Sequence, residues 1–226
     1  LRQSRYDAIV DLRTAFLPWV LRADRRAARW RAAQSQHAVE QHFAIASKML
    51  EGAPEIPDPC VWISDADQAF AAAAFRRYGG MRCLALAPGA NWPGKIWPLH
   101  RFRELIELGT DHFDLVAIFG GSQDRTITAE LAAGCRLPVI DFAGATSLTE
   151  AAALLDHATA FVGNDSGLGH LSAARNIRTL TLFGRGKPER YRPWGKRVAV
   201  VEAPQRELSL LRAEVVAQTL FQLLES

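Results

Sequence analysis

The stretch best suited to chemistry is residues 161–174, FVGNDSGLGHLSAA, where an apolar run reaches Asp165, Ser166 and Gly167. A helical pattern begins at once, and the start of a helix offers unpaired N–H groups and a partial positive charge that suit a diphosphate. Gly167 would let a phosphate approach the backbone closely, and Ser166 could cap the helix and donate its hydroxyl. His170 lies four residues after Ser166, on the same helical face. Taken alone, this pattern is more simply explained as a helix cap followed by a packed histidine.

Two further turns carry side chains that could meet the same ligand. Residues 86–98, LAPGANWPGKIWP, form a loop rich in glycine and proline that contains Asn91 and Lys95. A lysine there could neutralise phosphate charge, although a single solvated surface lysine explains it equally well. Residues 119–125, FGGSQDR, place Asp124 at the start of the next helix. Asp124 could cap that helix or hold the hydroxyl pair of a ribose, as acids do in dinucleotide-binding folds.

The elements that must position these turns alternate between strand and helix, which predicts an α/β fold with a parallel sheet. We expect strands at residues 83–87, 114–119, 138–141, 160–163, 179–183 and 198–201, with helices between them and a closing helix at 208–224. Six such strands make a complete doubly wound unit. The three turns follow the first, second and fourth strands, so their ligand-facing ends should meet at one edge of the sheet. This convergence favours a shared site over three separate surface features.

The first part of the chain is poorer in strands. We expect a strand at residues 6–12, a helix at 14–23, a helix at 38–50, an extended proline-rich linker at 52–59, a short strand at 61–64 and a helix at 67–78. This is too few βα units for a Rossmann-like domain, so we expect further units upstream of Leu1. The prediction is a partial N-terminal domain over residues 1–80 and a complete C-terminal Rossmann-like domain over 81–226.

Composition excludes several classes of protein. Hydrophobic residues make up 49% and charged residues 23% of the chain, with a net charge of +3, which is ordinary for a globular protein. The scattered Cys60, Cys83 and Cys135 indicate neither a disulfide framework nor a zinc site, and favour a reducing compartment. No apolar run is long enough for a membrane span. Five arginines crowd residues 22–31; nucleic acid, an anionic acceptor or an anionic lipid could bind them, but we interpret them as a solvated helical face.

In order and spacing, these motifs resemble glycosyltransferase family nine, the heptosyltransferase group. Its members carry a Pro-Gly-rich loop with a lysine before Trp-Pro, a Gly-rich turn with an acid, and an Asp-Ser/Thr-Gly-x-x-His-x-x-Ala segment. Residues 182–194 (LFGRGKPERYRPW) and 37–41 (HAVEQ) are also similar to family segments. The resemblance covers essentially the whole chain.

The resemblance implies a two-domain GT-B fold and transfer of a heptose from ADP-heptose to a lipopolysaccharide inner-core sugar. It implies inversion, no metal, no cofactor and no nucleic-acid partner. The location would be the cytoplasm, possibly with peripheral contact at the inner face of the inner membrane. Family members use an aspartate early in the N-terminal domain as the general base. We interpret Asp7 and Asp11 as turn and strand-end residues, and we find no counterpart of this base in the sequence. We therefore expect the donor-binding half to be intact and the catalytic half to be truncated.

By the same resemblance, Lys95 would neutralise the donor diphosphate. The other expected donor-binding residues are Asn91 in the donor loop, Asp124 at the ribose, Thr146 beside the adenine, and Asp165, Ser166 and Gly167 at the helix start, supported by His170. His37 would lie in a segment that faces the acceptor. Gln41 stands where relatives often have arginine, which puts the identity of the acceptor in doubt.

Three alternatives stay open: a sugar-nucleotide epimerase of similar fold, a non-catalytic nucleotide-sugar-binding module, and a nicotinamide-dependent oxidoreductase. The last is disfavoured because Gly167-Leu168-Gly169 follows the fourth strand and lacks the third glycine of a dinucleotide fingerprint.

Overall fold

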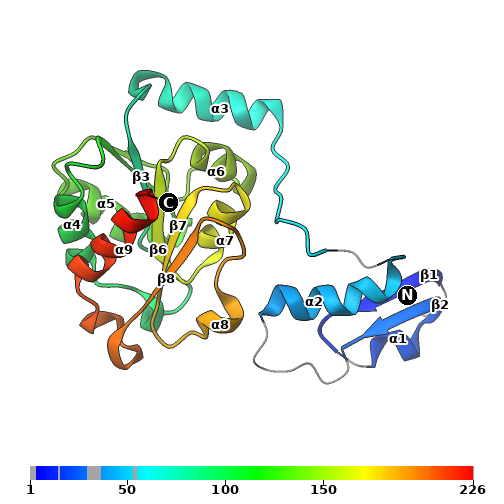
Figure 1. Cartoon of the computed structure of the whole chain (residues 1–226). Coiled ribbons are helices and arrows are strands. Elements are labelled where there is room, and N and C mark those ends of the chain that lie inside the picture. Colours follow the sequence, from blue (N-terminus) through cyan, green and yellow to red (C-terminus); the bar gives the residue numbers. More distant parts are fainter. Residues whose placement is uncertain (1–3, 15, 30–36, 53–54, 226) are drawn as a thin grey trace. The chain divides into compact units, whose positions relative to one another are not determined.

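The computed structural model describes residues 4–14, 16–29, 37–52 and 55–225. The chain forms two compact units, shown in Figure 1. The first unit runs to Pro57 and includes Glu189–Tyr191; the second unit comprises Asp58–Pro188 and the chain from Arg192 onward. This division comes earlier than the predicted boundary at residue 80, because helix α3 (Asp65–Phe75) packs against helix α6 (Leu148–Leu155) of the second unit. No helix in the described part of the chain is long and apolar enough to cross a membrane.

The second unit is built on six parallel strands in the order β5-β4-β3-β6-β7-β8. Their bounds are β3 Cys83–Ala87, β4 Leu115–Ile118, β5 Val139–Asp141, β6 Ala160–Asn164, β7 Arg178–Phe183 and β8 Val198–Glu202. Leu84 of β3 lies opposite Val116 of β4 on one side and Ala160 of β6 on the other. The strand order therefore reverses between β3 and β6, and open α/β sheets bind ligands beyond the carboxyl ends of the strands at such a point. The predicted doubly wound sheet is confirmed.

Helices cover both faces of this sheet (Figure 1). Alternate residues of β3 divide between the faces, as a strand with period two requires. Leu84 and Leu86 pack with helices α4 (Leu99–Leu108), α5 (Arg125–Ala133) and α9 (Ala213–Glu225), whereas Ala85 and its neighbours pack with α3 and α6. Strands buried on both faces explain why the sequence shows continuous apolar runs rather than alternation. The remaining helical segments are α7 Gly167–Ala174, α8 Pro188–Tyr191 and the 3-10 turns Arg76–Tyr78, Pro93–Lys95, Ser122–Asp124, Pro204–Arg206 and Leu208–Leu210.

Side-chain caps fix the starts of the two packed helices α3 and α6. The Ser64 hydroxyl accepts the Asp67 N–H at 3.2 Å, and the Asp67 carboxylate accepts the Ser64 N–H at 3.0 Å. Ser147 and Glu150 form the same reciprocal capping box at α6. Each box satisfies N–H groups that a helix start leaves without an intrahelical partner.

The first unit contains two parallel strands, β1 (Arg5–Asp11) and β2 (Arg22–Ala28). Helix α1 (Leu17–Val20) lies between them in sequence, and α2 (Ala38–Ala46) leads into a 3-10 turn at Ser47–Met49. The predicted helix at residues 14–23 is wrong apart from α1. The interpretation of the arginine-rich stretch as a helical face is also wrong, because its described part forms strand β2, with Ala23 and Ala27 buried and Arg22, Arg25 and Arg26 exposed. Arg31 lies outside the described residues. Residues 61–64 are extended but form no strand among the described residues, so that prediction is wrong too.

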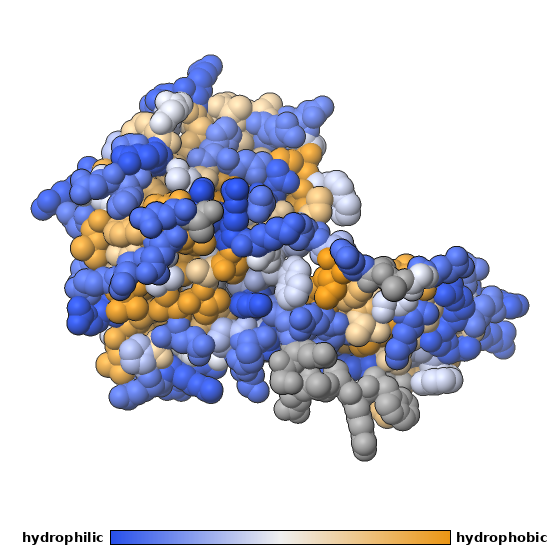
Figure 2. All heavy atoms as spheres, viewed as in Figure 1, coloured by the Kyte–Doolittle hydropathy of each residue, from blue (hydrophilic) through white to orange (hydrophobic). Residues whose placement is uncertain are grey.

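Polar and charged side chains cover most of the face shown in Figure 2, and apolar side chains reach the surface in both units.

Candidate functional site

The loop after β3 and the end of β6 meet at the point where the strand order reverses. There the Lys95 ammonium lies 2.6 Å from Oδ2 of Asp165, with the two side chains 33% and 12% exposed. Asp165 directly precedes Ser166, the residue before helix α7. The structure thus brings a cation from one predicted turn to the helix start of another, although the two residues are 70 positions apart in sequence.

A buried amide holds this loop in place. Asn164, the last residue of β6, donates from Nδ2 to the carbonyl of Pro88 at 2.7 Å and accepts the Trp97 N–H at Oδ1 at 3.0 Å. Trp97 is fully buried, and its indole N–H donates to the Leu211 carbonyl at 2.9 Å. Both ends of the loop are therefore tied to the core, and Lys95 lies between the two attachment points. Sequence reasoning missed Asn164, although an amide at the end of a buried strand is a recognisable signal, because a buried amide must find partners.

The start of α7 is open. A side chain placed on Gly167 would meet no atom within 4 Å, so there is open space beside the first residue of the helix. Ser166 forms no side-chain cap with the helix, unlike the predicted capping role. Its Oγ is buried without a hydrogen-bond partner in the described part of the chain. A buried hydroxyl without a partner is unfavourable, so a ligand that reaches the helix start would find this donor available.

Asp124 caps its own turn. Its Oδ2 accepts the Gly121 N–H at 2.8 Å. A Cβ atom placed on Gly89 would lie only 2.3 Å from Oδ1, the other carboxylate oxygen of Asp124. Gly89 is therefore required by the close approach of the second loop to the first. Asp124 precedes helix α5 but its side chain makes no capping hydrogen bond with that helix, so the predicted cap of α5 is wrong. The ribose-binding role stays a prediction.

An open pocket of about 290 Å³ lies among these loops. That volume falls near the lower end of the range of roughly 300–1,000 Å³ typical of ligand pockets. Its lining comes from the loops after β3 and β4, the start of α7 and Leu148 of α6: Gly89, Ala90, Asn91, Phe119, Gly120, Gly121, Gln123, Asp124, Leu148, Ser166, Gly167 and Leu168. It therefore gathers four of the predicted donor-binding residues, namely Asn91, Asp124, Ser166 and Gly167.

The other predicted site residues lie elsewhere. Thr146 is half-buried and stands two residues before Leu148, and His170 is exposed on α7; neither lines the pocket. His37 is buried in the first unit, where its Nδ1 accepts the Val39 N–H at 3.2 Å and its backbone N–H donates to Glu40 at 3.0 Å. His37 thus caps helix α2. The described residues contain no group of three or more His, Cys, Asp or Glu side chains that could hold a metal ion.

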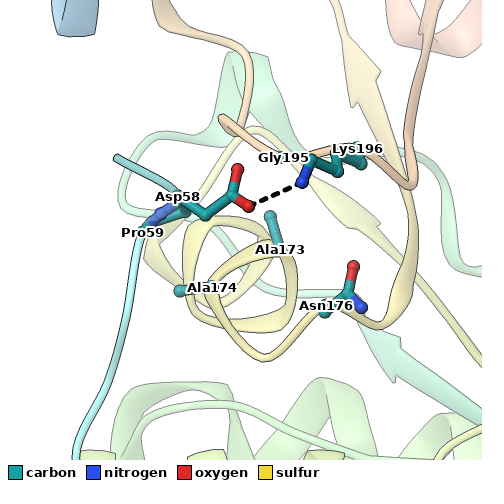
Figure 3. Close-up of a pocket in the computed structure, with 7 residues that line it drawn as sticks. All are labelled: Asp58, Pro59, Ala173, Ala174, Asn176, Gly195 and Lys196. Atoms are coloured by element: carbon teal, nitrogen blue, oxygen red, sulfur yellow. Dashed lines mark ion pairs between the residues drawn. The ribbon is translucent and has the colours of Figure 1, made fainter. Parts of the chain in front are cut away.

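A second hollow, of about 190 Å³, lies at the C-terminal end of α7, the end away from Gly167 (Figure 3). The Asp58 carboxylate and the Lys196 ammonium form an ion pair there at 2.9 Å, beside Ala173, Ala174 and Asn176. The C-terminal end of a helix carries a partial negative charge, so this hollow is unsuited to a diphosphate. The partial positive charge of α7 lies at its other end, beside Gly167.

Residues 10–219 match the model of glycosyltransferase family 9 (heptosyltransferase). The chain belongs to this family. Lipooligosaccharide heptosyltransferase 2 of Haemophilus influenzae is 29% identical to it over 187 residues, which cover 77% of this chain and 54% of that protein. The chain therefore spans about half the length of the curated relatives it matches.

Solved structures agree on the fold. The glycosyl transferase family 9 structure from Veillonella parvula matches with a TM-score of 0.85 at 18% identity, covering 97% of this chain and 74% of that one. An E. coli heptosyltransferase, WaaC, solved with ADP-2-deoxy-2-fluoro heptose, matches with a TM-score of 0.68 at 28% identity, covering 95% of this chain and 64% of that one. These matches confirm the expected α/β fold of the GT-B type.

Proposed function

We propose that this chain binds the ADP-sugar donor of a heptosyltransferase, and that the whole protein transfers heptose from ADP-heptose to a lipopolysaccharide inner-core acceptor. The observation that carries the proposal is the position of the Lys95 ammonium, 2.6 Å from Asp165 and next to the open start of α7. A lysine and a helix start together provide positive charge where a diphosphate would lie. Family membership supports the reaction class.

The proposed reaction is an inverting displacement. The acceptor hydroxyl oxygen forms a bond to the anomeric carbon on the face opposite the diphosphate, and the bond from that carbon to the diphosphate oxygen breaks. The electron pair leaves with ADP, whose growing negative charge Lys95 and the N–H groups of α7 would stabilise without a metal. The acceptor proton passes to a general base.

Asp11 does not fit the role of that base. The Asp11 carboxylate accepts hydrogen bonds from the Arg13 and Thr14 N–H groups and from the Thr14 hydroxyl. These bonds favour the ionised form and lower the pKa of Asp11. A carboxylate so engaged is a turn cap and a poor proton acceptor.

The remaining details rest on the relatives. The structure of E. coli WaaC with ADP-2-deoxy-2-fluoro heptose supports ADP-heptose as the donor. The Haemophilus relative is a lipooligosaccharide heptosyltransferase, which supports a core sugar as the acceptor. We place the reaction in the cytoplasm at the inner face of the inner membrane, where such an acceptor would be anchored.

Calorimetric titration of this chain with ADP-heptose, ADP and NADH tests the donor proposal. We expect ADP-heptose and ADP to bind and NADH to bind far more weakly; tight binding of NADH with none of ADP-heptose would favour an oxidoreductase. Release of ADP in the presence of a core acceptor then tests transfer. Donor binding without ADP release would favour a non-catalytic binding module, and conversion of ADP-heptose to an isomer without acceptor would favour an epimerase.

A further inference from the structure

The loop after strand β7 passes directly beside the Lys95–Asp165 pair. A Cβ atom placed on Gly186 would lie 2.9 Å from Oδ2 of Asp165, the same oxygen that the Lys95 ammonium contacts. Arg185 directly precedes Gly186, so this loop brings a second cation close to the pair. Because β7 lies next to β6 on the side away from β3, the loop borders the start of α7 opposite the loop after β4.

The side chain of Trp92 joins this loop to the loop that carries Lys95. The indole ring folds back over Gly94, where a Cβ atom would lie only 2.7 Å from Cη2 of the ring. The guanidinium carbon of Arg185 lies 6.0 Å from the centre of the same ring, within the range of a cation–π interaction. The two loops also meet through their backbones, because a Cβ atom on Gly184 would lie 3.5 Å from the Gly94 carbonyl oxygen. Arg185 therefore holds the ring from the side of β7.

A carboxylate orients Arg185 in turn. Glu207 accepts a hydrogen bond from Nη2 of the guanidinium. It follows Gln205 and Arg206, whose φ angles of 54° and 60° lie in the left-handed region. That region is unfavourable for residues with a side chain and persists where the surrounding structure maintains it. A hydrogen bond of 3.0 Å from the Glu207 N–H to the Pro204 carbonyl closes the turn, so the fold maintains an unfavourable turn that presents Glu207 to Arg185.

The pocket among the loops has room for only part of a nucleotide sugar, since its volume is near the lower end for ligand pockets. Its lining runs from Gly167 at the start of α7 to Leu148, and it includes neither Lys95 nor Asp165. A nucleoside in this pocket would place its diphosphate at the start of α7. The sugar on the second phosphate would then continue past Lys95 toward the loop after β7, where the Trp92 ring lies.

We propose that Trp92 is a specificity-determining residue for the sugar of the donor, and that Arg185 is the positioning residue that holds its ring. The C–H groups of a sugar ring can pack against an aromatic face, which supplies a large and rigid apolar contact. ADP has no group at this position, so the contact discriminates between ADP-heptose and ADP. The proposal rests on the proposed function and extends it to the part of the donor that lies outside the pocket.

Calorimetric titration of each variant with both ADP-heptose and ADP tests the proposal. Trp92→Ala should weaken ADP-heptose binding by about three- to tenfold and leave the affinity for ADP within about twofold of the parent. Trp92→Phe should keep most of the preference for ADP-heptose, because it retains an aromatic face. Arg185→Met should lose about two- to fivefold toward ADP-heptose alone. Added to Trp92→Ala, it should cause no further loss, because Arg185 acts through the ring.

Trp62→Ala and Arg136→Gln are the matched controls. Trp62 follows Val61, whose carbonyl accepts a hydrogen bond from Arg175 at the C-terminal end of α7. Arg136 pairs with a glutamate, as Arg185 does, but it lies before β5, at the amino end of that strand. Both controls should bind ADP-heptose and ADP as the parent does.

Two results would overturn the proposal while leaving the donor site intact. Equal losses for ADP and ADP-heptose in Trp92→Ala would show that the ring only supports its loop. Unchanged ADP-heptose binding in a folded Trp92→Ala variant would show that the ring does not contact the sugar. Failure of the parent to bind ADP at all would instead refute the donor site, and the role of Trp92 with it.

Discussion

Replacement of Lys95 by alanine should damage ADP binding far more than it damages the fold. In the structure the Lys95 ammonium contacts one carboxylate oxygen of Asp165. An ammonium has three N–H donors, so this contact leaves two for a diphosphate. We therefore interpret Asp165 as the residue that holds Lys95 at the start of α7, and not as a competitor for the ligand.

The expected magnitudes follow from the exposure of the pair. Lys95 is one-third exposed, and an ion pair of this kind contributes about 0.5–1 kcal/mol to stability, or a few °C in Tm. A hydrogen bond to a charged group contributes roughly 1.5–3 kcal/mol, so loss of the contact to the diphosphate should weaken ADP binding by about 10- to 150-fold.

The assay is calorimetric titration with ADP, accompanied by thermal unfolding of each variant. Lys196→Ala is the matched control, because Lys196 also pairs with an aspartate, Asp58 at 2.9 Å, but at the opposite end of α7. It should lose less stability than Lys95→Ala, because its ion pair is more exposed, and none of the affinity for ADP.

Equal ADP affinity in Lys95→Ala and the parent would refute the proposal that Lys95 contacts the diphosphate at the start of α7. Asp165→Ala should also weaken binding while the chain stays folded. The double variant Lys95→Ala/Asp165→Ala should then bind no worse than Lys95→Ala, since Asp165 acts through Lys95. If the losses of binding free energy in the two single variants add up in the double variant, Asp165 contacts the donor independently of Lys95.

Three further outcomes are expected. Ser166→Ala should change the free energy of unfolding by less than about 0.5 kcal/mol, since the hydroxyl has no partner within the described residues. The same variant should bind ADP roughly threefold to tenfold more weakly, and an unchanged affinity by titration would exclude the hydroxyl from the site. Asn164→Leu should lower the free energy of unfolding in urea by about 2–4 kcal/mol, because it leaves a buried carbonyl and a buried N–H unpaired; a loss well below 1 kcal/mol would contradict the bridging role. Burial raises the pKa of the Cys83 thiol to about 12. At pH 8 a thiol reagent should therefore label the exposed Cys60 within minutes and Cys83 only after unfolding, as followed by mass spectrometry. Rapid labelling of both cysteines would show that β3 opens readily.

The sheet of the second unit could be predicted because its strands are buried on both faces and are separated by glycine-rich turns. Periodicity and turn chemistry then agree on the same elements, and the order of the turns predicts where Lys95 and Asp165 meet. Asn164 was missed because its importance depends on two backbone groups, at positions 88 and 97, that are distant in sequence. A local pattern can mark the buried amide, but it cannot identify the two backbone groups that the amide joins.

The first unit shows where such reasoning fails. Residues 22–28 contain arginine and alanine, which favour helix by intrinsic propensity. In the structure they pair with β1 as a parallel strand, and pairing between distant segments overrides propensity. Arginine side chains reach solvent from either conformation, so their clustering does not distinguish a strand from a helix.

The amide of Asn164 has a consequence for the thermodynamics of donor binding. Because it fastens both ends of the lysine-bearing loop before any nucleotide arrives, association need not immobilise that segment, and the entropic penalty of ordering it is already met during folding. Affinity for ADP should therefore depend strongly on charge and only weakly on the mobility of the loop. A rise in ionic strength should lower the affinity for ADP by more than a cosolvent that rigidifies the chain raises it.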